Sequence, residues 1–155
     1  MEDSYARLWG EFSSLLRGLK ELNAHALETT GVRCEQAAAH VLGRLELLGP
    51  VRLTELAHAL GLDPSSVSRQ VSSLERSGWV VREKDPADQR AQRLELTPTG
   101  GQVVATVRAA RERALQTLTP SWSTQDLDDL SSCLARLNTD LDAHRELLSE
   151  RQETA

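Results

Sequence analysis

The sequence predicts a mainly helical α+β fold, and three observations lead to that prediction. Short patterns typical of a strand, two helices and a β-hairpin follow one another between Val51 and Gly100. Longer helical patterns lie before and after this stretch. Aromatic residues make up 3% of the chain, and leucine, alanine and valine dominate its apolar residues. We therefore expect one compact domain, with a helix in residues 1–30, a winged helix-turn-helix in 31–100 and further helices in 101–155.

Two helices are expected before the strand. The first is predicted over about residues 4–27, because apolar residues recur on one face at helical spacing. The second is predicted over about residues 32–48, where Gly49-Pro50 ends it. The apolar face of the first helix is expected to comprise Leu8, Phe12, Leu15, Leu16, Leu19 and Leu22. The inner face of the second is expected to comprise Ala38, Val41, Leu42, Leu45 and Leu48.

The next two helices are short and are separated by a tight turn. The first is expected to open at Thr54, a good N-cap, and to stop at Gly61, which accepts the left-handed conformation. Asp63 and Pro64 then suit the cap and the first position of the second helix. The buried stripe of this second helix is predicted to be Val67, Val71 and Leu74.

The opposite face of the second helix carries small hydroxyls and arginines. At about 100° per residue, the side chains that point away from the buried stripe are those of Ser65, Arg69, Ser72, Ser73 and Arg76. Such a face can approach a base-pair edge without clashing, and Arg69 is long enough to reach a guanine or a phosphate. A solvated surface helix has a similar composition, so the interpretation depends on the helix-turn-helix spacing and on the hairpin that follows.

A β-hairpin follows the second helix. Residues typical of strands in Trp79–Lys84 predict its first strand, and alternation in 93–96 predicts the second. The polar loop Asp85–Arg90 is expected to join them. Asp88 is two residues from Arg90, and we expect its carboxylate to hold the guanidinium in one pose. An arginine held in this way at a hairpin tip is suited to insertion into a DNA minor groove, whereas the alternative is an ordinary surface turn.

Two more helices are expected after the hairpin. Thr97 and Pro98 suit the start of the first, which should run to Thr119-Pro120. Ser123 and Asp126 have the spacing of a capping box at the start of the second. The second helix then has a heptad seam, formed by Leu127, Leu130, Leu134, Leu137, Leu141, His144 and Leu148.

This seam predicts a two-fold dimer in which the first and last helices of two chains interleave. The interface is expected to contain Leu8, Phe12, Leu127, Leu130, Leu134, Leu137 and Leu141. A dimer is also the arrangement that a two-fold DNA site requires. The alternative is that the seam packs on the preceding helix of the same chain.

The strand, helices and hairpin contain a set of short motifs. They are Leu53-Thr54-Glu55-Leu56-Ala57, Ser66-Val67-Ser68-Arg69, Leu74-Glu75, Gly78-Trp79-Val80, Asp85-Pro86-Ala87-Asp88-Gln89-Arg90 and Leu96-Thr97-Pro98-Thr99-Gly100. Together they resemble the MarR family of bacterial transcription regulators. The match is dense over Val51–Gly101, and the flanks match in the order of their helices alone. The family's hairpin usually reads Asp-Pro-x-Asp-Arg-Arg, so Gln89 here removes one potential phosphate contact per wing.

The resemblance implies a sequence-specific transcription regulator, with a repressor as our expectation, that binds a pseudo-palindromic duplex as a homodimer. It would place the second short helix in the major groove and Arg90 in the minor groove. The residues expected to contact or to support contact with DNA are Ser65, Ser66, Ser68, Arg69, Ser72, Asp88, Arg90 and Arg93. The resemblance also implies a small aromatic or anionic effector. Its candidate pocket residues are Tyr5, Trp9, Phe12, His40 and Arg44, for which plain core or surface positions are the alternative.

Composition and charge set limits on these expectations. The net charge of the chain is −5, but residues 63–100 contain equal numbers of acidic and basic side chains. The acidic excess therefore lies outside the proposed DNA-binding segment. Because that segment is neutral rather than basic, we expect few phosphate contacts and weak non-specific binding.

Other classes of protein are not favoured by the sequence. No apolar stretch is long enough to span a membrane and Glu2 and Asp3 do not suit a signal peptide, so we expect a cytoplasmic protein. Cys34 and Cys133 are expected to be free thiols. The sequence contains no phosphate-binding loop, nucleophile elbow or metal-ligand spacing, so we expect no enzyme activity, cofactor or metal. A winged-helix module that binds proteins instead of DNA is the alternative function, and Arg69 and Arg90 argue against it.

Overall fold

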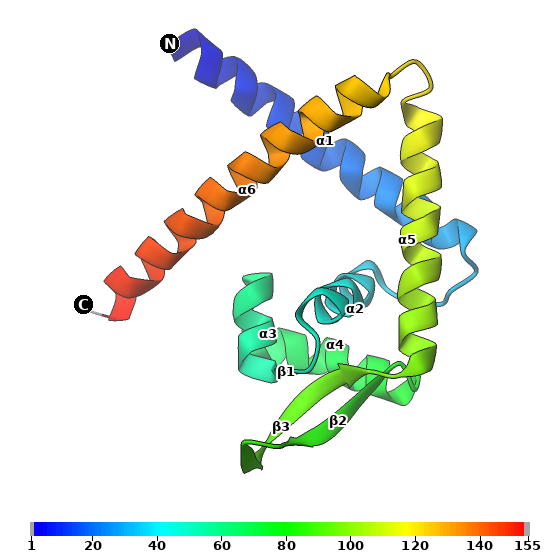
Figure 1. Ribbon diagram of the computed structural model, residues 1–155, viewed down its shortest axis with the longest axis vertical. Coiled ribbons are helices and arrows are strands. Elements are labelled where there is room, and N and C mark those ends of the chain that lie inside the picture. Colours follow the sequence, from blue (N-terminus) through cyan, green and yellow to red (C-terminus); the bar gives the residue numbers. More distant parts are fainter. Residues whose placement is uncertain (1, 154–155) are drawn as a thin grey trace. The chain divides into compact units, whose positions relative to one another are not determined.

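The computed structural model describes the backbone of residues 2–153 and the side chains of residues 3–88 and 90–144. Its elements are α1 (Glu2–Thr29), α2 (Gln36–Leu48), β1 (Val51–Arg52), α3 (Leu53–Leu60), α4 (Pro64–Arg76), β2 (Val80–Asp85), β3 (Asp88–Leu96), α5 (Pro98–Leu118) and α6 (Thr124–Glu153) (Figure 1). The chain is mostly helical with one small sheet, so the predicted mainly helical α+β fold with a winged helix-turn-helix is confirmed.

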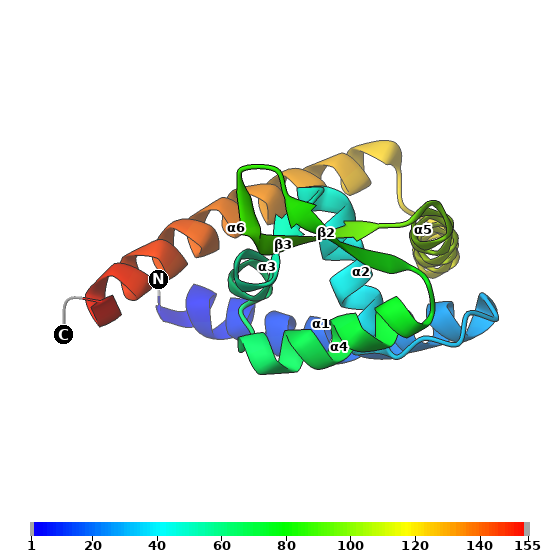
Figure 2. The same ribbon diagram turned by 90° about the horizontal axis from the view of Figure 1, so that it is seen from below.

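The chain forms two compact units, Met1–Leu115 and Gln116–Ala155. The first contains the helix-turn-helix, the sheet and most of α5, and the second contains the end of α5 together with α6. Within the first unit, α4 and the β2–β3 hairpin lie at the same end (Figures 1 and 2). Within residues 2–153, no helix combines the length and the apolar character that crossing a membrane would require.

The sheet is antiparallel, with the strand order β1-β3-β2. Val51 of β1 pairs with Leu94 of β3, and β2 pairs with β3 from Val80–Leu96 outward to Asp85–Asp88. The hairpin turn therefore consists of Pro86 and Ala87, and the predicted six-residue loop Asp85–Arg90 is wrong. The strands continue because paired backbone groups extend the ladder through residues whose polarity had indicated a loop.

The helix-turn-helix is capped largely as its sequence predicts. The Asp63 carboxylate accepts a hydrogen bond from the backbone N–H of Ser66 at 2.9 Å, and Gly61 has a φ of 64° at the end of α3. The expected Thr54 cap is wrong, because α3 begins at Leu53. The carboxylate of Glu55 accepts instead from the backbone N–H of Arg52 at 3.0 Å, which satisfies one of the free donors at the start of α3.

Two other boundaries test the predicted helix ends. The helix expected from about residue 32 begins at Gln36, and Leu48 at its end is 41% exposed rather than inward. The capping box of α6 is confirmed, because Asp126 accepts from the backbone N–H of Ser123 at 2.8 Å and Ser123 accepts from that of Asp126 at 3.2 Å. The difference at α2 arises because residues 32–35 form an irregular connection instead of a first helical turn.

The core of the first unit joins α2, α3, α4 and the sheet. The predicted stripe of α4 is confirmed, since its three apolar residues are fully buried. They belong to one cluster with Leu42 and Leu45 of α2, Leu56 of α3 and Leu94 of β3. Burial of such side chains contributes about 1.5–3 kcal/mol each to folding. This shared core fixes the orientation of α4, so that its polar face is left outward.

A close backbone contact joins the end of α4, the hairpin and the start of α5. The Thr97 hydroxyl donates to the Gly78 carbonyl at 2.7 Å and accepts from the backbone N–H of Gly100 at 3.0 Å. A Cβ atom at Gly100 would lie 2.0 Å from the carbonyl oxygen of Trp79, which is impossible without movement of backbone. Glycine at this position is therefore required for α5 to start against the strand.

Candidate functional site

The outer face of α4 presents hydroxyls and an arginine, as its sequence predicts. Ser65 and Arg69 are exposed, and Ser66, Ser68 and Ser72 are half-buried. The guanidinium of Arg69 donates to the Ser66 hydroxyl at 3.2 Å. This contact positions the arginine along the helix surface without neutralising its charge.

The start of α4 is fixed by the carboxylate of Asp63. The hydroxyls of Ser65 and Ser66, together with the backbone N–H of Ser66, hold the pKa of Asp63 well below its ordinary value. The Ser65 hydroxyl donates its proton to this carboxylate at 2.5 Å, so its oxygen remains able to accept a hydrogen bond from a ligand.

The wing is held beside its turn by the buried carboxylate of Asp85, which is 1% exposed. One oxygen accepts from the Ala87 backbone N–H at 2.9 Å, and the other accepts from Nε of Arg52 at 2.8 Å. The same oxygen forms an ion pair with Nε of Arg93 at 3.3 Å. The Ala87 amide and Arg52, in that order, hold the pKa of Asp85 below its ordinary value. The cluster of Arg52, Asp85 and Arg93 therefore joins all three strands, and we call it the wing clamp.

Asp88 does not hold the guanidinium of Arg90, so that part of the sequence interpretation is wrong. One Asp88 oxygen accepts from the backbone N–H of Arg90 at 3.0 Å, and the other is 3.8 Å from Nη2 of Arg52. Asp88 thus fixes the main chain of the strand from which Arg90 projects. The Arg90 side chain is exposed, and within the described part of the chain no ion pair joins it to a carboxylate. The side chain of Gln89 lies outside the described residues.

Sequence reasoning missed the wing clamp because its three members are far apart in the chain. Asp85 had been assigned to a loop, although an Asp followed by Pro is typical of a turn in which the carboxylate bonds the amide two residues later. Only the strand register brings Arg52 and Arg93 beside it. Arg93, which was expected near DNA, has its Nε in this cluster while its side chain remains 40% exposed.

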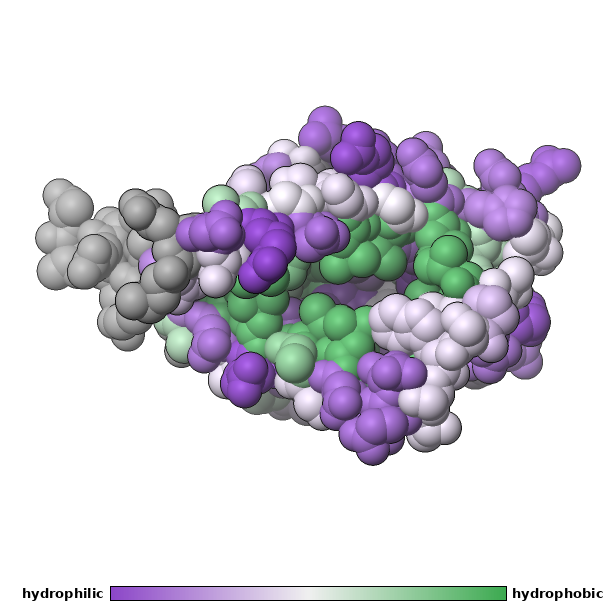
Figure 3. Space-filling model, turned by 90° about the horizontal axis from the view of Figure 1, so that it is seen from above, coloured by the Kyte–Doolittle hydropathy of each residue, from purple (hydrophilic) through white to green (hydrophobic). Residues whose placement is uncertain are grey.

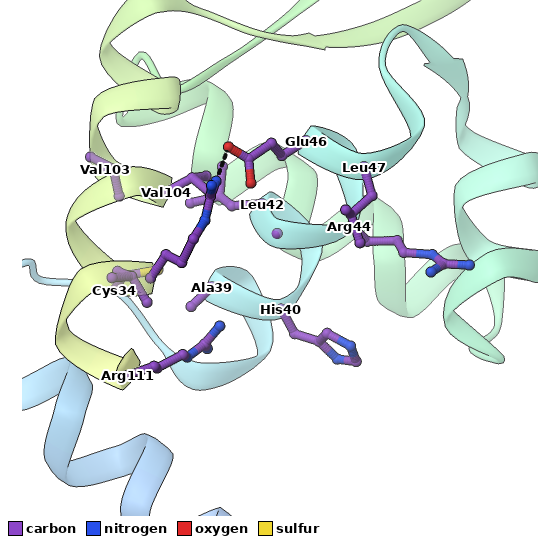
Figure 4. Close-up of a pocket in the computed structure, with 13 residues that line it drawn as sticks. Cys34, Ala39, His40, Leu42, Arg44, Glu46, Leu47, Val103, Val104 and Arg111 are labelled. Carbon is purple, nitrogen blue, oxygen red and sulfur yellow. Dashed lines mark hydrogen bonds and ion pairs between the residues drawn. The ribbon is translucent and has the colours of Figure 1, made fainter. Parts of the chain in front are cut away.

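A pocket of about 330 Å³ lies between α2 and α5 (Figure 4). His40 and Arg44 line it, together with Cys34, Arg108 and Arg111. Tyr5 and Trp9 on α1 are 70% and 73% exposed, and neither they nor Phe12 line this pocket. Arg108 and Arg111 were missed, although an arginine four residues after buried Val107 places a charge on the inner face of the helix.

The charges of the pocket are only partly balanced. Arg108 forms an ion pair with Glu46, which Figure 4 marks with a dashed line. The Nε atoms of Arg44 and Arg111 are buried and have no hydrogen-bond partner in the described part of the molecule. Arg111 extends from α5 toward α2, and the guanidinium of Arg44 points away from it (Figure 4). Burial, and to a lesser extent Glu35, raises the pKa of the Cys34 thiol, so the thiolate is disfavoured.

The predicted interface residues with described side chains are exposed or half-buried. On α1, Leu8 is exposed and Phe12 is half-buried. On α6, Leu127, Leu130, Leu134 and Leu141 are exposed and Leu137 is half-buried. Figure 3 shows hydrophobic residues in green at the surface among purple hydrophilic ones. The side chain of Leu148 lies outside the described residues.

No group of three or more potential metal ligands is assembled among the described side chains.

Together, the helix-turn-helix, the exposed α4 face and the wing define a winged helix-turn-helix protein. Residues 35–91 match the model of the MarR family. The chain is 32% identical over 104 residues to the Bacillus subtilis HTH-type transcriptional regulator YxaD, covering 67% of this chain and 73% of YxaD. The chain therefore belongs to the MarR family and is a DNA-binding transcription regulator rather than an enzyme.

Two further similarities agree with this assignment. The chain is 29% identical over 92 residues to the Escherichia coli K12 transcriptional repressor MprA, covering 59% of this chain and 52% of MprA. A MarR family protein from Bacillus stearothermophilus has the same fold, with a TM-score of 0.81 and 23% identity over 92% of this chain and 98% of that one. The structural similarity extends the family's fold to nearly the whole chain.

The wing clamp makes the stability of the fold depend on pH. Asp85→Asn removes the negative charge between two arginines, so its melting temperature should be several degrees lower at neutral pH. Because the folded-state pKa of Asp85 lies below its ordinary value of about 3.9, the carboxylate stabilises the fold above that value. This stabilisation is lost as pH falls through the folded-state pKa. The difference in melting temperature between the two proteins should therefore shrink below about pH 4.

Circular dichroism melts from neutral to acidic pH would measure this difference. Glu95→Gln is the matched control, because Glu95 is exposed on β3 and is not part of the clamp. A difference for Asp85→Asn that stays constant down to the lowest pH at which both proteins fold would contradict the role of the charge.

Proposed function

We propose that this regulator binds a pseudo-palindromic duplex as a homodimer and represses transcription. Residues 31–100 would contact the DNA, and the helices in 1–30 and 101–155 would form the dimer. The observation that carries the proposal is the exposed face of α4, where small hydroxyls surround Arg69, together with a wing that carries an exposed Arg90 on β3 near its turn. The similarity to MprA, which is named a transcriptional repressor, supports repression.

The two DNA-contacting elements are suited to different grooves. An α-helix fits the major groove, where base edges carry a distinct pattern of donors and acceptors. A hairpin arginine fits a narrow minor groove, whose negative potential attracts a guanidinium. The residues assigned to DNA contact are Ser65, Ser66, Ser68, Arg69, Ser72, Arg90 and Arg93, and Asp88 is assigned to hold the main chain at Arg90.

The two arginines should contribute in different ways. Arg69→Ala should cost roughly 1–3 kcal/mol and relax the preference at one base position, because it removes a contact to a base edge. Arg90→Ala should weaken binding most at sites with A·T-rich flanks, where the minor groove is narrow. Selection from random duplexes with the wild-type protein would supply the site, and fluorescence anisotropy would measure each affinity.

Arg90→Lys is the matched control, because it keeps the charge but loses the planar guanidinium. It should retain general affinity and lose part of the preference for A·T-rich flanks. Unchanged affinity of Arg90→Ala for the selected site would mean that the wing does not enter the groove. Absence of any selected sequence for the wild-type protein would refute sequence-specific binding itself.

The dimer is proposed from the leucines that repeat along α6 and those exposed on α1. Exposed apolar stripes of this regularity are typical of helices that pack against a partner. Leu134→Asp should place a charge in the seam at a cost of several kcal/mol and yield a monomer. Ser132→Asp is the matched control, because Ser132 lies on the opposite side of α6 and is exposed. Sedimentation of a folded wild-type monomer at micromolar concentration would overturn the proposal.

The pocket between α2 and α5 is proposed as the effector site, with a small aromatic carboxylate as the ligand class. Its apolar wall includes Leu42 and Val104, and the unpartnered Nε of Arg111 would pair with the carboxylate. Burying an unpaired polar atom is unfavourable, so an anion that pairs with it is favoured. Calorimetry with benzoate should give binding that Arg111→Gln weakens, and benzoate should reduce DNA affinity. Equal binding of neutral benzamide would argue against recognition of the carboxylate.

A further inference from the structure

A second hollow, of about 480 Å³, lies beside α4. It is a different site from the proposed effector pocket. Its polar lining comes from two segments that are distant in sequence. Arg33 and Glu35 lie on the α1–α2 connection, and Arg69, Ser73 and Arg76 lie on the outer face of α4. Seen from below in Figure 2, α4 faces the viewer. We call this site the arginine hollow.

The arginine hollow carries an excess of positive charge. Its three arginines are exposed, and among the described residues no ion pair neutralises any of them. Arg69 makes one hydrogen bond, to the neutral hydroxyl of Ser66. Glu35 is the acidic residue of the lining, so one negative charge faces three positive ones. Ser73 is exposed beside the arginines and adds a hydroxyl that can donate to an anion. This combination suits a phosphate group.

The position of the hollow indicates where that phosphate would come from. An α-helix with its side chains is about 10–12 Å wide. The major groove of B-DNA is about 12 Å wide and is bordered by the two phosphate backbones. A helix that enters this groove therefore has a phosphate chain along each flank. Arg69 and Arg76 lie on one flank of α4, and they line the arginine hollow together with Arg33.

We propose that the arginine hollow binds one backbone phosphate of the DNA strand that borders α4, with Arg33 and Arg76 as its positioning residues. The inference rests on the proposed entry of α4 into the major groove. Such a contact fixes the depth and angle of the helix without reading sequence. It also extends the DNA contact surface beyond the helix-turn-helix and the wing to the α1–α2 connection, which carries no contact expected from the sequence.

Salt dependence and phosphate ethylation test the proposal with the full-length protein and its selected duplex. Arg33→Gln should weaken binding about tenfold, the scale of one exposed ion pair in each half-site. The loss should be similar on the selected and on unrelated DNA, so the sequence preference is retained. The slope of log affinity against log salt should become shallower by about 2, since one phosphate contact is lost per half-site. Arg76→Gln should have the same effects.

Ethylation of single phosphates should identify one phosphate per half-site that the wild-type protein requires and that Arg33→Gln does not. Arg17→Gln is the charge-matched control, because Arg17 lies on α1 and does not line the hollow. Unchanged affinity and slope for Arg33→Gln, in the presence of normal sequence selection by the wild-type protein, would overturn this inference and leave the proposed function intact. Failure of the wild-type protein to select DNA would refute the proposed function itself.

A small free anion is the alternative ligand for the arginine hollow, in place of a phosphate of the DNA backbone. Inorganic phosphate, compared with chloride at equal ionic strength, should not raise the melting temperature of the wild-type protein more than that of Arg33→Gln. If it does, and the salt slopes of the two proteins on DNA are equal, then the hollow binds a small anion instead of the DNA backbone.

Discussion

The shape of the wing depends on one buried carboxylate, that of Asp85. Removing this group from water is costly unless its oxygens are paired, and here an amide and two arginines surround it. Arg52 immediately precedes α3, so the same ion pair connects the start of the helix-turn-helix to the end of β2 beside the hairpin turn. The position of the wing turn relative to the helix-turn-helix therefore depends on this contact.

A second constraint joins α4 to α5. The carbonyl of Trp79 leaves no space for a side chain at Gly100, and Thr97 bridges the end of α4 to the first turn of α5. The core of α2 packs with α4, while other α2 residues line the pocket against α5. Hence a ligand between α2 and α5 would act on two helices that are both in direct contact with the recognition helix or its carboxyl-terminal end. This gives the proposed effector a short physical route to the DNA-contacting surface.

Local signals made the fold largely predictable. Asp63, Pro64 and Gly61 act within one helical turn, and the apolar period of α4 requires no knowledge of distant residues. The errors occurred where long-range pairing decides the structure. The first strand of the hairpin was expected to end before Asp85, although the ladder continues to the Asp85–Asp88 pair. Asp88 is close to Arg90 in sequence, but strand geometry directs its carboxylate to the backbone amide. The arginine hollow likewise depends on a tertiary contact that no spacing in the sequence reveals.

Eight arginines of the first unit fall into two groups of four, and this division explains how an acidic chain can bind DNA. Arg52, Arg82, Arg93 and Arg108 pair with carboxylates and hold elements together. Arg33, Arg69, Arg76 and Arg90 are exposed and lack such pairs among the described residues. Acidic groups elsewhere are screened over about 10 Å at moderate salt. The electrostatic potential at a bound DNA phosphate is therefore set by the exposed, unpaired arginines, whatever the net charge of the whole chain.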